Sequence, residues 1–378
     1  MISSCSSSWS TAIKKGSIPD QTFHQSIPIE IKTGLLIVPV TIHGQEYKFI
    51  FDSGAPTSIS KEIQEKFKFK KVAKSHIVDT EGNRKKVNYV SVDTLFLGDV
   101  PLLDQTAFVG EFSSNPVIGC MKVDGIIGSN TMRSCNWTID SFKKEILLFN
   151  SDVLISEDIY SAPFTIDKQY DMLVDLEISN SKVRNIKIDY GSNGSLSLPK
   201  SAFEKLKDGG ILTKTYSVIG QSQTGFIGEV KNVEYEISYI DTVYLGDCLF
   251  ANVRLKGKGS GLLGNRLLRD YIVTIDWTKQ MLYFEKNTSV LRSNARFGIG
   301  LGYNKAGSFV YVQSVTKGSS AYEKGLRPLL KVSKVDSLDF TGENNYCDYV
   351  NYINYNPDSM LLTLEDGRFF KLQKEVLD

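Results

Sequence analysis

Two aspartates in this chain end apolar segments, and each is followed two positions later by glycine. They lie in the tripeptides Asp52-Ser53-Gly54 and Asp189-Tyr190-Gly191. An ionised carboxylate in apolar surroundings is costly, and one such tripeptide is equally compatible with an ordinary turn. Two of them at equivalent positions of a repeat favour a pair of carboxylates. Such a pair shares one proton, so that one member acts as a base and the other as an acid.

An internal duplication predicts that the two aspartates meet. Each tripeptide is followed about 75 residues later by two apolar residues and a glycine, in Ile126-Ile127-Gly128 and Leu262-Leu263-Gly264. Two further pairs of similar segments follow the same order, 95–99 with 243–247 and 136–140 with 272–277. Four landmarks in one order indicate two copies of one structural unit, each supplying one aspartate.

The elements that must position these residues are predicted to be mainly strands. The runs 36–42 and 172–178 are apolar with strand-like alternation, and glycine or polar turns follow them. Each copy is expected to contain one short helix, at 61–67 with Ser60 as N-cap and at 200–207 after Pro199. No long helical stripe competes with this pattern, so the fold class is mainly β.

These motifs resemble those of retropepsin- and pepsin-like aspartic peptidases, in particular the bacterial single-chain relatives of the retroviral enzymes. The segment Phe51–Ala55 looks like their catalytic loop, and the two apolar-apolar-Gly segments look like the chain that passes beneath it. The resemblance implies two acid-protease β-barrel lobes, at residues 27–155 (lobe 1) and 156–288 (lobe 2). It also implies that Asp52 and Asp189 activate a water to hydrolyse an extended peptide or protein, without a covalent intermediate, cofactor or metal.

The resemblance further implies roles for the residues around the two aspartates. In this family a Thr or Ser follows each catalytic Asp, and its hydroxyl braces the opposite loop. Ser53 can do this, whereas the hydroxyl of Tyr190 lies at the end of a ring and would miss its partner. The alternative function is therefore a catalytically degenerate peptide-binding protein. The residues expected to support the dyad are Ser53, Gly54, Ala55, Tyr190, Gly191, Ser192, Ile127, Gly128, Leu263 and Gly264.

A hairpin in lobe 1 is expected to close over the substrate as a flap. Its residues are Val78, Asp79, Thr80, Glu81 and Gly82, although an ordinary exposed hairpin is equally compatible with them. The glycine-rich stretch 217–228 is the expected equivalent in lobe 2 and is predicted to be mobile.

Residues 295–378 are predicted to form a small separate domain that resembles a PDZ domain. Its carboxylate-binding loop would comprise Gly298, Ile299, Gly300 and Leu301, and the segment 309–326 continues the likeness with a strand, a turn and a short helix. The closing strand is expected at 361–364. The resemblance implies capture of a peptide C-terminus. A purely structural appendage is the competing interpretation, because residues 327–340 depart from the PDZ pattern.

Composition and the cysteines narrow the expected partners and location. The 378 residues carry a formal net charge of +1, and no basic tract with interleaved aromatics favours nucleic acid as a partner. Residues 2–5 resemble the end of a bacterial lipoprotein signal. This predicts a lipid anchor on Cys5, a flexible tether at 1–26 and a periplasmic or outer-membrane location, with a chance match as the alternative. The other cysteines are expected as buried hydrophobes, with a Cys120–Cys135 disulfide as the alternative.

Overall fold

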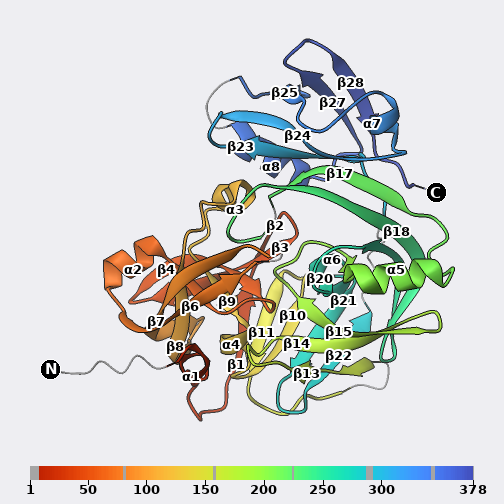
Figure 1. Ribbon diagram of the computed structural model, residues 1–378. Coiled ribbons are helices and arrows are strands. Elements are labelled where there is room, and N and C mark those ends of the chain that lie inside the picture. The colour runs from red at the N-terminus through yellow and green to blue at the C-terminus, as the bar shows by residue number, and fades with distance from the viewer. Residues whose placement is uncertain are drawn as a thin grey trace.

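Strands dominate the structure, as predicted. The computed structural model describes residues 8–79, 82–155, 159–223, 225–286, 293–341 and 345–377. Strands in these ranges form sheets of eight, six and fourteen strands (Figure 1). No helix in these ranges is long and apolar enough to cross a membrane.

Lobe 1 is built on the eight-stranded sheet, in the order β2-β3-β4-β9-β5-β8-β7-β6. Its predicted helix is confirmed as α2 (Lys61–Phe67), and Ser60 caps it by accepting a 3.2 Å hydrogen bond from the Ile63 amide. Two shorter helices follow, α3 (Pro116–Met121) and α4 (Ser129–Met132). The strands are β2 (Glu30–Lys32), β3 (Leu35–Ile42), β4 (Gln45–Asp52), β5 (Ser58–Ser60), β6 (Lys70–Val78), β7 (Arg84–Leu97), β8 (Val100–Gly110) and β9 (Gly125–Gly128).

Lobe 2 repeats the same plan around Asp189. In each copy the aspartate-bearing strand pairs in parallel with the apolar-apolar-Gly strand, so that Asp52 lies opposite Gly128 and Asp189 opposite Gly264. The predicted helix is α5 (Lys200–Asp208), and α6 (Asn265–Leu268) matches α4. The strands are β13 (Thr165–Ile166), β14 (Met172–Ile178), β15 (Ser181–Asp189), β16 (Leu196–Ser197), β17 (Tyr216–Ser222), β18 (Lys231–Leu245), β19 (Cys248–Lys256) and β20 (Leu262–Gly264).

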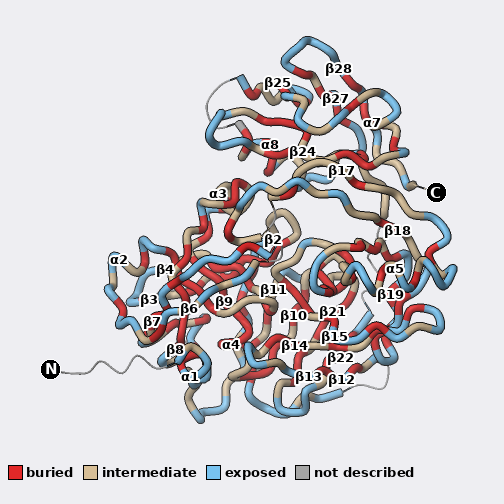
Figure 2. The backbone as a smooth tube through the Cα atoms, viewed as in Figure 1, coloured by how far each residue is buried: buried red, intermediate tan, exposed pale blue. Residues whose placement is uncertain are grey.

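A six-stranded sheet joins the two lobes. Strands β10 and β21 pair across the pseudo-symmetry, and the hydroxyls of Thr138 and Thr274 lie 2.8 Å apart. One hydrophobic core runs through both lobes around this sheet, visible as the buried centre of the tube (Figure 2). The strands are β1 (His24–Pro28), β10 (Asn136–Asp140), β11 (Glu145–Phe149), β12 (Tyr160–Pro163), β21 (Tyr271–Asp276) and β22 (Met281–Lys286).

The C-terminal residues form a unit with its own hydrophobic core, above the lobes in Figure 1. The strand expected at 309–312, the short helix after it and the strand at 361–364 are all confirmed. The elements are β23 (Ile299–Asn304), β24 (Phe309–Thr316), α7 (Ser320–Glu323), β25 (Lys331–Val335), β26 (Leu338–Asp339), α8 (Asn345–Asn354), β27 (Ser359–Leu364) and β28 (Phe369–Gln373).

The second-copy hairpin differs from the mobile loop that its glycines suggested. Strand β17 pairs with β18 on one edge and with β24 on the other, so lobe 2 and the C-terminal unit share one sheet. A Cβ at Gly220 would lie 2.2 Å from the carbonyl oxygen of Gln313. Glycine at this position therefore serves the close approach of β24 to β17.

The described part of the predicted N-terminal tether is not a tether. Helix α1 (Trp9–Ala12) packs on lobe 1, and the side chains of Ala12 and Ile13 are at most 1% exposed. The Thr106 hydroxyl donates a 2.7 Å hydrogen bond to the Ala12 carbonyl. The few apolar side chains of this mostly polar stretch pack against lobe 1, and their burial favours an ordered conformation. Cys5 lies outside the described residues.

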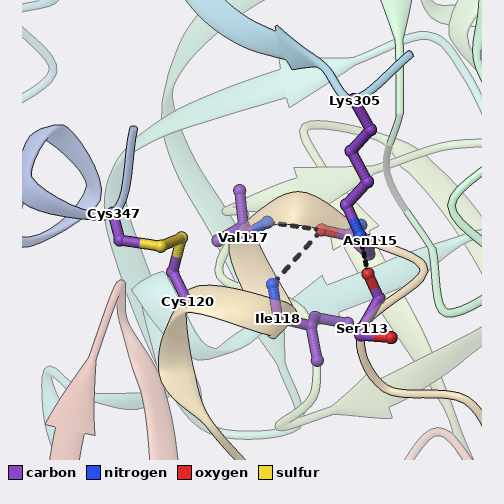
Figure 3. The surroundings of a disulfide bond; sticks show 7 residues. All are labelled: Ser113, Asn115, Val117, Ile118, Cys120, Lys305 and Cys347. Atoms are coloured by element: carbon purple, nitrogen blue, oxygen red, sulfur yellow. Dashed lines mark hydrogen bonds between the residues drawn. A yellow bond between two sulfur atoms is a disulfide. The ribbon is translucent and has the colours of Figure 1, made fainter. Parts of the chain in front are cut away.

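The expectation that Cys120 and Cys347 are free buried hydrophobes is wrong, and so is the alternative of a Cys120–Cys135 disulfide. Cys120 on α3 instead bonds Cys347 on α8, which ties lobe 1 to the C-terminal unit (Figure 3). Cys135 and Cys248 are free and buried, as hydrophobes. The bonded partners are 227 residues apart in sequence, so only the packing of α3 against α8 brings them together.

Candidate active site

The two sequence-predicted aspartates meet on the floor of a cleft between the lobes. Asp52 ends β4 and Asp189 ends β15, and both line a cavity of about 700 Å³. Each strand is a central member of its sheet and is buried between apolar neighbours, which fixes the position of its last residue.

The glycine of each tripeptide allows the opposite carboxyl to approach. A Cβ at Gly54 would lie 2.6 Å from Cγ of Asp189, and one at Gly191 would lie 2.1 Å from Cγ of Asp52. The Gly54 amide also donates a 2.8 Å hydrogen bond to Oδ1 of Asp52. Any side chain at either glycine would therefore push the carboxyls apart.

The apolar-apolar-Gly segments support these loops from below. A Cβ at Gly128 would lie 2.3 Å from the Ala55 carbonyl oxygen, and one at Gly264 would lie 2.4 Å from the Gly194 carbonyl oxygen. The side chains of Ile127 and Leu263 before them are fully buried. The signature that repeats in the sequence thus reflects a loop that crosses closely over a strand in each copy.

Of the two hydroxyl interactions expected between the aspartate loops, the one from lobe 1 is present. The Ser53 hydroxyl donates a 2.7 Å hydrogen bond to the Ile188 carbonyl and accepts a 3.1 Å hydrogen bond from the Tyr190 amide. The Tyr190 ring turns into the core instead, with its centroid 5.6 Å from that of Phe51. Its buried hydroxyl has no hydrogen-bond partner among the described residues. Lobe 2 therefore contributes no hydroxyl brace from this position.

Burial and mutual repulsion hold a proton on the pair. Burial raises the pKa of Asp52 well above its usual range, and the neighbouring Asp189 raises that pKa further. Burial also raises the pKa of Asp189, against the opposing effects of Lys187 and of hydrogen bonds from Asp52, Gly191 and Ser192. The pair titrates as a unit and keeps one proton at pH values where separate carboxyls would have lost both.

Two charged residues beside the dyad, Lys187 and Asp171, were not predicted from the sequence. Nζ of Lys187 forms an ion pair with Asp171 and donates a 3.3 Å hydrogen bond to the Gly54 carbonyl in lobe 1. Burial raises the pKa of Asp171 to about 6, although Lys187 opposes the rise. A signal existed for Lys187, since it lies between the apolar residues Ile186 and Ile188, two positions before Asp189. Asp171 lies just before β14 and carried no comparable signal.

The predicted flap is a hairpin of β6 and β7 whose tip borders the cleft. Val78 and Asp79 line the cavity, and the Asp79 carboxylate accepts hydrogen bonds from the Asn83 amide and side chain at 2.9 and 3.0 Å. Gly82 has a φ of +76°, which suits the tight turn. Thr80 and Glu81 lie outside the described residues.

A loop of lobe 2 reaches across the cleft to lobe 1. The ring of Phe226 packs against those of Phe108 and Phe112, with centroids 5.4 and 4.9 Å apart. The Asn115 side chain donates hydrogen bonds to the carbonyls of Gln223 and Gly225 at 2.8 and 3.0 Å. A Cβ at Gly225 would lie 2.7 Å from Oδ2 of Asp79, so this loop meets the flap and is held to lobe 1 by these contacts.

Three basic side chains lie along the lobe 2 wall of the cleft. They are Arg254, Lys256 and Lys258, with Tyr235 beside them. Nζ of Lys256 lies 4.7 Å and Nζ of Lys258 5.7 Å from the centroid of the Tyr235 ring. This wall presents positive charge to whatever enters the cleft.

The predicted carboxylate-binding loop borders two cavities, because its Leu301 also lines the cavity that contains the dyad. Gly298 has a φ of +71° and leads into β23, where Ile299 pairs with Val315. Gly300 and Leu301 border a second cavity of about 780 Å³, between β23 and α8. The basic residues that also line it are Arg266, Arg269, Arg296 and Lys374.

No metal-ligand cluster is formed by the parts of the chain that the structure describes. Groups of three or more His, Cys, Asp or Glu side chains suited to a metal ion do not occur there. The chemistry available at the dyad is that of two carboxyls sharing a proton.

Comparison with known families agrees with this geometry for the first copy. Residues 38–131 match the aspartyl protease family model. That segment contains the Asp52 loop, the flap strands and the Ile127-Gly128 support, so lobe 1 is similar to aspartyl proteases. No curated protein matches the chain.

Proposed function

We propose that this chain is an aspartic endopeptidase whose catalytic dyad is Asp52 and Asp189. The observation that carries the proposal is the mutual approach of two loops, in which each glycine touches the opposite carboxyl. The family match of lobe 1 supports peptide-bond hydrolysis. The raised pKa values of the two aspartates support a shared proton.

The reaction follows from the shared proton. The ionised carboxylate takes a proton from a water held between the two loops, and the resulting hydroxide attacks the scissile carbonyl. The protonated carboxyl polarises that carbonyl as negative charge develops on its oxygen. The tetrahedral intermediate then collapses as a proton passes to the leaving amine. No nucleophilic side chain is required.

The substrate is an extended peptide or protein segment. The cavity of about 700 Å³ runs under the β6–β7 flap, which is the place for such a segment. The lobe 2 loop anchored by Phe226 meets the flap at Asp79 and covers the cleft together with it. Both features favour endopeptidase action on a chain that enters sideways.

Hydrolysis of a peptide library between pH 3 and 7 tests the proposal. We expect Asp52→Asn and Asp189→Asn each to lower kcat/KM by roughly 10³-fold while leaving the fold intact. The exposed Asp99 provides the matched control, since Asp99→Asn should retain full activity. Undiminished cleavage by Asp52→Asn would contradict the proposal, as would insensitivity to a pepstatin-type inhibitor.

A binding function is the second candidate, and two observations favour it. Tyr190 leaves one brace unmade, and the second cavity lined by Gly300, Leu301 and basic side chains suits a peptide carboxylate. In this alternative the chain captures peptides at the cleft and at the PDZ-like loop without cleaving them. Binding of a library peptide without turnover, in protein whose dyad is intact, would favour it.

We also propose a location in the cell envelope, with Cys5 as the lipid anchor. A structural disulfide between Cys120 and Cys347 supports an oxidising compartment. Metabolic labelling with a fatty acid, lost in Cys5→Ser, would test the anchor.

A further inference from the structure

Lys187 breaks the symmetry of the duplication beside the dyad. It lies two residues before Asp189 on β15, at the position that Ile50 occupies before Asp52 on β4. Ile50 is 3% exposed and packs in an apolar cluster. A lysine at the equivalent place needs a reason, because a buried ammonium is costly without partners.

The partners of Lys187 come from both lobes. Asp171 of lobe 2 forms an ion pair with its Nζ, and the side chains of the two are 3% and 24% exposed respectively. The same Nζ donates a 3.3 Å hydrogen bond to the carbonyl of Gly54, which lies within the Asp52 loop of lobe 1. A lobe 2 side chain thus holds the lobe 1 catalytic loop by its backbone.

We propose that Lys187 is a positioning residue that takes over the bracing that Tyr190 does not provide, and that it supplies positive charge to the dyad. The Ser53 hydroxyl bonds the Asp189 loop from lobe 1. A serine or threonine at position 190 would donate the equivalent hydrogen bond from lobe 2 to the Asp52 loop. Lys187 instead donates a hydrogen bond to that loop, at the Gly54 carbonyl. The inference rests on the proposed function, since it assigns a role within the dyad of that enzyme.

The charged groups that face the dyad are few and oppose one another. Lys187 favours ionisation of Asp52 and of Asp189, whereas Asp171 disfavours ionisation of Asp52 and is itself affected by Asp167. The effect of Lys187 on Asp52 is the larger of the two. The ion pair therefore leaves a net positive influence at the dyad, which lowers both of its apparent pKa values.

Two substitutions should consequently move the active pH range in opposite directions. Lys187→Met removes the cation and leaves Asp171 buried without its partner, so that Asp171 becomes neutral. Both dyad pKa values then rise, and we expect both limbs of the profile of kcat/KM against pH to move up by about 1 pH unit. Asp171→Asn removes an anion only above about pH 6, where burial lets Asp171 ionise, and it keeps the cation, so the upper limb should move down while the acidic limb stays in place. Lys187→Arg keeps the charge and a donor, and should leave both limbs in place.

Lys182 provides a matched control on the same strand. It forms a 3.2 Å ion pair with Asp175, and their side chains are 51% and 38% exposed. Lys182→Met should leave the pH profile unchanged. A purely structural role for Lys187 would lower kcat in Lys187→Met without moving either limb, and that result would overturn the inference. If Lys187→Met does not fold, the downward movement in Asp171→Asn decides the question alone.

A direct titration separates this inference from the proposed function. The carboxyl carbons of Asp52 and Asp189 can be followed by ¹³C NMR in the wild type, Lys187→Met and Asp171→Asn. Opposite shifts of the dyad pKa values support the inference even if no peptide is cleaved, a result that would reject the peptidase alone. Unchanged dyad pKa values in both variants would overturn the inference while leaving the peptidase standing.

Discussion

The hydroxyl of Ser53 in lobe 1 donates a 2.7 Å hydrogen bond to the carbonyl oxygen of Ile188 in lobe 2. It also accepts one from the Tyr190 amide at 3.1 Å, so one buried oxygen joins two backbone groups of the opposite loop. Tyr190, at the equivalent position of lobe 2, has no hydrogen-bond partner for its hydroxyl among the described residues. The junction of the two aspartate loops therefore depends on Ser53 more than a symmetric pair of hydroxyls would require.

We expect Ser53→Ala to lower both stability and activity. The variant leaves a buried carbonyl and a buried amide without their partner, which costs about 1–3 kcal/mol of unfolding free energy. Urea denaturation at fixed pH measures the loss. Ser53→Thr keeps the hydroxyl and is the control. An alanine variant as stable as the wild type would show that the brace contributes nothing.

Gly191→Ala should strongly reduce hydrolysis, because its Cβ would lie 2.1 Å from Cγ of Asp52. The carboxyl must move by about 1 Å to relieve this contact, and a displacement of that size costs roughly 10²-fold in rate. Steady-state hydrolysis of a cleavable peptide measures the effect. Gly119→Ala is the control, since its added Cβ would meet no atom closer than 3.6 Å. Full activity of Gly191→Ala would mean that the loops are less tightly apposed.

Asp52→Asn should become more stable than the wild type as pH rises. The folded state raises the pKa of Asp52 above the ordinary value of 3.8, so the folded protein binds a proton that the unfolded chain releases. The stability associated with that proton is complete below pH 3.8 and is lost as pH rises through the folded-state pKa. Asparagine is neutral throughout and does not suffer this loss. Urea unfolding from pH 3 to 8 should show a difference that grows with pH. Parallel curves for the two proteins would contradict the raised pKa.

Local elements of this fold follow from the sequence, because their causes are local. Ser60 caps α2 within the segment that predicted it, and the apolar-apolar-Gly segments end where the Asp loops cross them. The duplication also predicted that Asp52 and Asp189 share one cleft, since equivalent strands of two copies face one another across a pseudo-twofold axis. These features needed only periodicity, caps and repetition.

Long-range partners could not be predicted, because nothing near them in sequence identifies them. Cys120 finds Cys347 through the packing of α3 on α8. Strand β17 pairs with β24 because the C-terminal unit packs beside lobe 2. In both cases the packing of separate units decides the contact. Asp171 reaches Lys187 through the pairing of β14 with β15, in which Leu173 lies opposite Lys187.

The Cys120–Cys347 disulfide should stabilise the attachment of the C-terminal unit. It closes a long loop between residues 227 positions apart, and loss of such a bond costs about 2–4 kcal/mol. We expect Cys120→Ser/Cys347→Ser to unfold at lower urea concentration and to be cut by proteases between lobe 2 and β23. A reductant should lower the midpoint of the wild type and not that of the double variant. Equal midpoints for the two proteins would show that the β17–β24 pairing suffices.

The basic wall of the cleft should make acidic peptides the better substrates. Arg254, Lys256 and Lys258 line the cavity on the lobe 2 side, and apart from the dyad the cavity has Asp79 as its acidic lining residue. A substrate carboxylate near these cations gains up to about 1 kcal/mol per pair, and reversal of one charge replaces attraction by repulsion. We therefore expect Lys258→Glu to lower kcat/KM for a glutamate-containing peptide about 10-fold and to leave its glutamine analogue unaffected. The preference should weaken at high salt, since ions screen partly exposed charges. Lys143→Glu, at an exposed position outside the cavity lining, is the control. Equal kcat/KM values for the glutamate and glutamine peptides with the wild type would show that the wall does not select substrates.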